Sequence, residues 1–151
     1  MGLLYATSVT WRNNMKSSFK VNASFHKKIK SLEEKALVGA KDQLTDIARS
    51  AVNFSPVDTG AYVTSFSYTV GAGRPRGKDS ANRPTAASPE GQMEEGFSNL
   101  VGDITKVKKL EDLDKVTLRN GSPHASDVEY GEEWKRTQGY FVFAKLRNIY
   151  G

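Results

Sequence analysis

The tripeptide Asp58-Thr59-Gly60 is the part of the sequence whose residue types come closest to catalytic chemistry. In aspartic proteases this tripeptide holds one carboxylate of a pair that shares a proton. Because the chain has one copy, a homodimer would have to supply the second carboxylate. Here, however, the tripeptide follows a helix stop at Pro56 instead of an apolar strand. We therefore interpret it as a helix-to-strand turn.

The other polar residues do not form a recognisable catalytic or metal-binding group. His26 and His124 are far apart in the sequence, and neither has a second ligand at the spacing of a zinc site. The carboxylates Glu90, Glu94 and Glu95 are placed as expected for the acidic start of a helix. The chain has no cysteine, which excludes thiolate nucleophiles, thiolate metal ligands and disulfides. We predict a protein that is not an enzyme and that has no cofactor or metal.

A long amphipathic helix is predicted before the turn. Ser24 can cap its start, and Pro56 ends it because proline cannot donate the next backbone hydrogen bond. Apolar residues recur in steps of three and four, which places them on one face of a helix. They are Phe25, Ile29, Leu32, Ala36, Leu37, Ala40, Leu44, Ile47, Ala48, Ala51 and Val52. We expect this face to lie on an apolar surface.

A strand and a long loop are predicted after the turn. From Ala61 to Val70 larger and smaller side chains alternate, which is the period of a strand. Residues 71–89 have almost no apolar side chains and are predicted to be either a solvated tip or an arm that orders against a partner chain or a polyanion. The basic residues of this loop are Arg74, Arg76, Lys78 and Arg83.

Shorter elements are expected in the second half of the chain. Ser88 and Pro89 predict the start of a second amphipathic helix, which ends near Lys108 and Lys109. A strand is expected at residues 116–118 and a short helix at residues 124–131. Residues 139–144 are either a buried strand or the start of a last helix that runs to Tyr150.

The fold class that follows is α+β, with the long N-terminal helix packed on a small, mostly antiparallel sheet, a second helix and a long central loop. The length of 151 residues suits one domain, which we place at residues 24–151, preceded by an arm at residues 1–23. In the arm Tyr5, Thr7, Val9 and Trp11 alternate as in an edge strand. Trp11 is expected to dock on a neighbouring chain.

Composition and charge are those of a soluble globular protein, with 38% hydrophobic and 26% charged residues. No apolar run is long enough for a membrane helix, and the N-terminus lacks a signal-peptide pattern, so no membrane contact is expected. The lack of cysteine is compatible with an intracellular origin. The net charge of +5 is spread mainly over the N-terminal part and the central loop. This distribution favours solvated helix faces over a dedicated phosphate-binding surface.

Two segments in this order resemble the tail-completion and neck proteins of tailed bacteriophages, the head-to-tail joining family. The first is the long helix that runs into residues 55–60 (SPVDTG) and the following strand, and the second is residues 122–131 (SPHASDVEYG). The resemblance covers roughly residues 19–144, and the N-terminal arm and the long central loop depart from the family pattern. It implies that the motif residues fix the corners of the fold: Pro56, Asp58, Thr59, Gly60, Glu129, Tyr130 and Gly131. Glu129 is expected to accept hydrogen bonds from the first turn.

The function implied by this resemblance is structural. A small α+β subunit of this family would form a homo-oligomeric ring, most often a hexamer, that joins or seals the tail to the head connector. Its neighbours would be the head connector and the tail tube or terminator proteins, and DNA would pass through the lumen without sequence-specific binding. Such a virion protein of the neck is assembled in the cytoplasm of the host bacterium. The candidate contacts with other subunits or with DNA are Trp11, Arg74, Arg76, Lys78 and Arg83.

The alternative from another class is a basic nucleic-acid-binding module. In that case the loop arginines would bind phosphates, and binding would weaken steeply as salt is raised.

Overall fold

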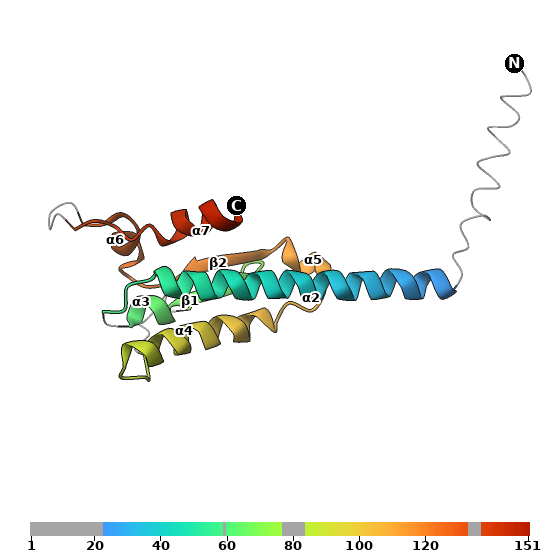
Figure 1. The fold of residues 1–151 in the computed structure, drawn as a ribbon, viewed down its shortest axis with the longest axis horizontal. Coiled ribbons are helices and arrows are strands. Elements are labelled where there is room, and N and C mark those ends of the chain that lie inside the picture. The colour runs from blue at the N-terminus through green and yellow to red at the C-terminus, as the bar shows by residue number, and fades with distance from the viewer. Residues whose placement is uncertain (1–22, 59, 77–83, 133–136) are drawn as a thin grey trace, which may run out of the picture. The chain divides into compact units, whose positions relative to one another are not determined.

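The computed structural model describes residues 23–58, 60–76, 84–132 and 137–151 (Figure 1). Two compact units are distinguished, residues 1–35 and residues 36–151. In the first unit the described residues 23–35 are helical and exposed. The second unit contains the sheet, the core and the other described helices. The predicted boundary between arm and domain, at residues 23 and 24, lies twelve positions before this division.

Helix α2 (Ala23–Phe54) is the long amphipathic helix that the sequence predicts. It begins one residue before the predicted cap Ser24. Ala48, Ala51 and Val52 are buried on its core side, and the two alanines let neighbouring elements approach closely. The helix ends where Pro56 requires it, and the Ser55 hydroxyl donates a 2.6 Å hydrogen bond to the Ala51 carbonyl, which satisfies one acceptor of the last turn.

The predicted strand at residues 61–70 is wrong in its first half. Residues Ala61–Thr64 form a short helix, α3, and strand β1 (Phe66–Val70) follows it. The helical turn is stabilised by its own hydroxyls, because the Thr64 hydroxyl donates to the Gly60 carbonyl and the Ser65 hydroxyl to the Ala61 carbonyl. Tyr62 and Val63 are both buried, which a helix against the core allows and a one-sided strand would not.

The sheet has two antiparallel strands, β1 and β2 (Val116–Asn120), with Tyr68 opposite Leu118. Strand β1 is buried along nearly its whole length, whereas half-buried and exposed residues alternate along β2. The α+β class and the packing of the long helix on a small antiparallel sheet are confirmed. The Tyr68 hydroxyl links the sheet to α2, because it donates a 2.7 Å hydrogen bond to the Leu44 carbonyl.

Helix α4 (Pro89–Ile104) starts as predicted, with Ser88 as its cap accepting a hydrogen bond from the Gly91 amide. It ends at Ile104, before the predicted end near residue 108. Gly96 lets it lie against α3, since a Cβ atom at this position would be 2.5 Å from the Val63 carbonyl oxygen. None of the described helices combines the length and apolarity of a membrane span.

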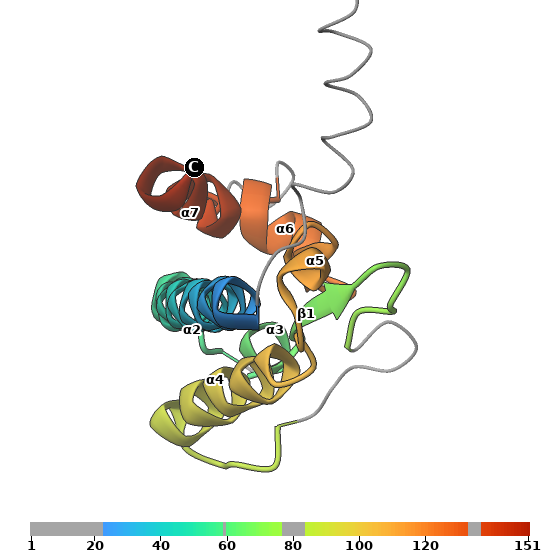
Figure 2. The ribbon, with the colours of Figure 1, turned by 90° about the vertical axis from the view of Figure 1, so that its right-hand side faces the viewer.

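Three short helices complete the described chain: α5 (Leu110–Leu113), α6 (Ala125–Tyr130) and α7 (Val142–Tyr150). Residues 139–144 therefore belong to a loop and a last helix, not to a strand. Figure 2 shows the α2 ribbon between those of α7 and α4, with β1 to one side. The Tyr150 and Ser50 hydroxyls, 2.8 Å apart, hydrogen bond the end of α7 to α2.

The core is centred on Phe66, which is fully buried. Its ring lies edge-on to the ring of Tyr62, with 5.2 Å between the ring centroids. The ring of Phe143 is tilted against it, with 6.0 Å between the ring centroids. Buried residues from α2, α4 and α7 pack around this group: Ala48, Ala51, Val52, Leu100, Ile104, Val142 and Leu146.

Candidate functional site

The turn at residues 55–60 is fixed by the close packing of Gly60. This residue is buried and has a φ of 72°, a conformation that favours glycine. A Cβ atom here would lie 2.6 Å from the Gln92 side chain of α4 and 2.7 Å from Pro84. The predicted corner is therefore a point where the start of α3 touches α4. Thr59 lies outside the described residues.

The second motif, residues 122–131, begins next to α3. The side chain of Asn120, at the end of β2, donates a 2.9 Å hydrogen bond to the Tyr62 carbonyl and accepts one of 2.9 Å from the Ser122 amide. The Ser122 hydroxyl then accepts a hydrogen bond from the His124 amide at 3.3 Å. Asn120 thus holds the start of α6 against α3.

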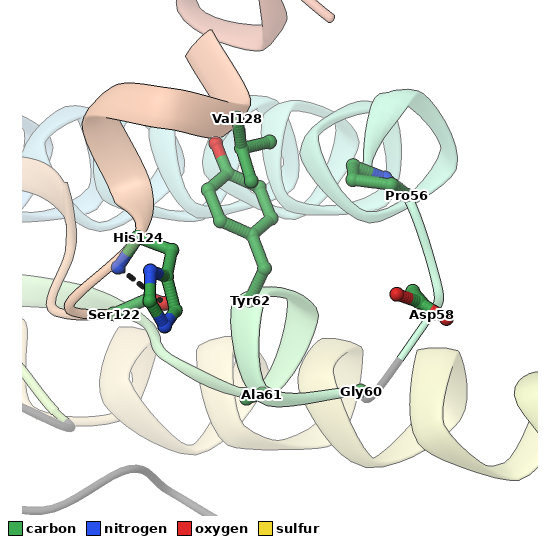
Figure 3. A pocket seen from close by; sticks show the side chains of 8 residues that line it. All are labelled: Pro56, Asp58, Gly60, Ala61, Tyr62, Ser122, His124 and Val128. Carbon is green, nitrogen blue, oxygen red and sulfur yellow. Dashed lines mark hydrogen bonds between the residues drawn. The ribbon is translucent and has the colours of Figure 1, made fainter. Parts of the chain in front are cut away.

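The two motifs meet at a pocket of about 200 Å³. Figure 3 shows the Tyr62 ring in the middle of the lining residues, between His124 of the second motif and Pro56 of the first. The lining residues are Pro56, Asp58, Gly60, Ala61, Tyr62, Ser122, His124 and Val128. Sites for cofactors and drug-sized ligands have volumes of roughly 300–1,000 Å³. This pocket is smaller than those sites.

Charge and burial differ between the wall and the rim of this pocket. No hydrogen-bond partner from the described residues reaches the buried Tyr62 hydroxyl. Its burial, together with the nearby charge of Glu129, raises its pKa far above the ordinary value. At the rim Asp58 is exposed, and so is His124, whose Nδ1 atom is 3.6 Å from the Asp127 carboxylate. Tyr62 was not predicted as a site residue, because its place in the pocket depends on the helical turn α3, for which the sequence pattern indicated a strand.

This arrangement offers little for catalysis. The Asp58 carboxylate is exposed, whereas a pair of carboxylates that shares a proton needs shielding from water. The Ser122 hydroxyl already accepts a backbone amide hydrogen bond. Among the described residues no three histidine, aspartate or glutamate side chains gather as metal ligands. Binding of a protein side chain is the chemistry that the pocket suits best.

The prediction that Glu129 accepts hydrogen bonds from the turn at residues 55–60 stays a prediction, because Thr59 lies outside the described residues and the described bonds of Glu129 go to another element. Its buried carboxylate accepts hydrogen bonds from the amides of Phe143 at 3.1 Å and Ala144 at 3.2 Å. These amides lie in the first turn of α7, whose N-cap residue Phe141 makes no side-chain cap. Glu129 therefore caps α7 from a distance, because a helix start leaves amides unpaired and favours negative charge.

The two motif residues that follow Glu129 differ in their surroundings. Tyr130 is 70% exposed and available for contact with another molecule. Gly131 has a φ of 83°, and a Cβ atom there would overlap the Thr137 carbonyl oxygen. Gly131 thus fixes a close crossing of the chain, as a corner residue should.

The candidate basic residues of the central loop also differ from one another. Arg74 is exposed. Arg76 is half-buried and bound within the fold, because its guanidinium donates hydrogen bonds to the Phe66 carbonyl at 2.6 Å and to the Asp103 carboxylate at 3.0 Å. Trp11, Lys78 and Arg83 lie outside the described residues, so their predicted roles stay predictions.

Asp103 is a buried charged residue that sequence analysis did not single out. It is 3% exposed and accepts hydrogen bonds from Arg76, from Lys106 at 2.8 Å and from the Tyr68 amide at 3.1 Å. The helical spacing of α4 could have placed it on the buried face, but its partners lie in other elements.

No protein-family model, curated protein or solved structure matches this chain.

Proposed function

We propose that this chain is the structural subunit of a homo-oligomeric ring in the neck of a tailed bacteriophage, where it joins or seals the tail to the head connector. The observation that supports the proposal best is the meeting of residues 55–60 and residues 122–131 at one pocket. These two segments carry the resemblance to the head-to-tail joining family. Because the two segments pack against each other, both contribute to the same corner of the fold.

Exposed apolar side chains also support association with other proteins. Val38, Tyr130 and Ile149 are 60%, 70% and 58% exposed. Neighbouring exposed apolar residues are the stronger sign of a contact surface, and on α2 Ile29 and Leu32, three residues apart, are 40% and 65% exposed. Rings close through heterologous contacts, in which one surface of a subunit binds a different surface of the next. The pocket suits one half of such a contact.

The alternative, a basic nucleic-acid-binding module, has less support. Arg76 already binds Asp103, so it cannot contribute to a phosphate-binding surface without breaking that ion pair. Arg74 remains exposed. In the ring that we propose, DNA passes through the lumen and meets scattered charges instead of a built site.

Native mass spectrometry and negative-stain electron microscopy of the full chain test the proposal. We expect closed rings of one stoichiometry, six subunits being the number that the family resemblance favours. The chain would also be found in the neck when virions are fractionated. A chain that stays monomeric at micromolar concentration and is missing from virions would contradict the proposal.

Two variants sharpen this test. Tyr130→Asp places a charge on an exposed apolar residue of α6 and is expected to weaken association, while Ser126→Asp, also exposed on α6, is the matched control. The alternative predicts a different result. If a monomer bound DNA tightly and lost that affinity in Arg74→Ala, with a steep dependence on salt, the nucleic-acid-binding hypothesis would replace the ring.

A further inference from the structure

The outer edges of the two strands differ in how their backbone groups are hydrogen bonded. In an antiparallel pair, alternate residues direct both backbone groups toward the partner strand. The Gly121 amide donates to the Ser65 carbonyl and the Gly71 amide to the Lys115 carbonyl, which fixes the phase of the alternation. Residues 66, 68 and 70 of β1 therefore direct their backbone groups away from β2.

The outer edge of β1 is closed by side chains. The outward amide of Tyr68 donates to the Asp103 carboxylate at 3.1 Å. The outward carbonyl of Phe66 accepts from the Arg76 guanidinium at 2.6 Å. Arg76 and Asp103 are paired at 3.0 Å, so one ion pair occupies both backbone groups. A further strand cannot join the sheet on this side without displacing that pair.

The outer edge of β2 is open. The same phase directs the backbone groups of Val116, Leu118 and Asn120 away from β1. Within the described chain no hydrogen bond reaches the amide or carbonyl of these three residues. Unpaired groups in a row are a template for an added strand.

The side chains of β2 suit an added strand on that edge. Val116 and Leu118 are half-buried and pack against the core cluster, while Thr117 and Arg119 are exposed on the opposite face. A third strand would extend the apolar face beyond Leu118 and cover it further. Its residues facing the core should then be apolar at every second position.

The N-terminal sequence has this pattern at three of four positions, with the β-branched Thr7 as the exception. At residues 5–11 Tyr5, Thr7, Val9 and Trp11 alternate with Ala6, Ser8 and Thr10. Aromatic and β-branched residues at every second position are typical of a strand with one buried face. The segment lies in the 22 residues that precede the described part of α2, and at about 3.3 Å per residue it is long enough to span the five residues of β2.

We infer that residues 5–11 of a second copy of this chain add to the open edge of β2 as a third strand. Each copy would give a strand to one neighbour and receive one from another. This is a heterologous contact, and such contacts close rings. The inference rests on the self-association in the proposed function but not on a place in a virion.

The lack of native cysteines permits a clean crosslinking test. One preparation carries Arg119→Cys and a mass tag, and the other carries a single cysteine at one of residues 5–11. After mixing and oxidation, only contact between copies gives a disulfide of mixed mass. Directly opposed residues on neighbouring strands have Cβ atoms about 4.5–5.5 Å apart, close to disulfide range.

The expected yield of mixed disulfide rises and falls with a period of two along residues 5–11. The exposed position Ser126→Cys replaces Arg119→Cys in the control, with a yield several-fold lower at every position. Equal yields from both, or yields without alternation, would overturn the inference.

Amide hydrogen exchange of the unmodified chain gives a second test that needs no variant. In one copy no described residue bonds the Leu118 amide, whereas the Thr117 amide is already bonded to β1. On association we expect exchange at Leu118 to slow by about tenfold or more, with little change at Thr117. Unchanged exchange at Leu118 in the assembled protein would contradict strand addition.

The two proposals fail separately. Closed rings without the alternating crosslinks would retain the proposed function and remove the strand contact. Alternating crosslinks in open chains or dimers would retain the strand contact and remove the ring.

Discussion

The closed edge of β1 and the open edge of β2 show how one small sheet can restrict pairing to one side. Both strands have five residues, and both direct alternate backbone groups outward. At β1 two of these groups, the Tyr68 amide and the Phe66 carbonyl, are bound by Asp103 of α4 and Arg76 of the central loop. At β2 the described residues supply no equivalent. We therefore expect the β1 edge to contribute to stability and the β2 edge to contribute to association between copies.

Replacement of Asp103 by alanine tests the closed edge most directly. It leaves Arg76 partly buried without its counter-charge and the Tyr68 amide without an acceptor. Breaking a buried ion pair in this way is expected to cost about 3 kcal/mol, toward the low end because Arg76 keeps some contact with water. The free energy of unfolding from urea denaturation measures the loss. A cost below about 0.5 kcal/mol, typical of surface positions, would show that the edge is not held by this residue.

Alanine substitutions of one arginine at each edge compare how much the two edges contribute to stability. Arg76→Ala removes the hydrogen bonds to Phe66 and Asp103 and should cost about 1.5–3 kcal/mol, less than the loss of Asp103 because Lys106 still pairs with that carboxylate. Arg119→Ala on β2 removes an exposed side chain and should change stability by less than about 0.5 kcal/mol. Similar losses in the two variants would remove the distinction between the edges.

Gly96→Ala tests whether the position of α4 maintains the closed edge. The added Cβ would be 2.5 Å from the Val63 carbonyl oxygen, so α4 must move away from α3 and take Asp103 with it. We expect a loss of about 1–2 kcal/mol, comparable to overpacking a core. Gly102→Ala on the same helix, where a Cβ meets nothing within 4 Å, is the control and should not destabilise. Equal stability of the two variants would contradict this account.

The smallest effect concerns pH and the connection into β2. Hydrogen bonds from the Lys108 and Lys109 amides lower the pKa of Asp112 below its usual value of 3.8. Because the folded-state pKa is the lower one, the stabilisation is present above pH 3.8 and is lost as the pH falls through the folded-state pKa. A pKa of Asp112 measured by NMR at or above 3.8 would contradict these hydrogen bonds. Asp112→Asn should make stability less sensitive to acid in this range.

Local signals were sufficient for much of this fold. The spacing of apolar residues and Pro56 predicted α2 and its end, and the cap at Ser88 predicted the start of α4. Each of these depends on residues within one or two helical turns. The α+β class followed from the order of such segments.

Residues with distant partners were not predictable in this way. Asp103 binds Arg76 and Tyr68, and Glu129 caps α7 through Phe143 and Ala144. Tyr62 was misplaced because the alternation that marks β1 extends by chance into the α3 turn. The pocket was not predicted, since its two walls come from separate segments.

The cap that Glu129 gives to α7 makes the last helix part of the pocket's support. One end of α7 is tied to α6 by Glu129, and the other end is tied to α2 by Tyr150 and Ser50. Fraying of α7 would free α6 and with it the pocket wall that carries Val128. A protein that fills the pocket would therefore protect the C-terminus from proteases without contacting the C-terminus itself.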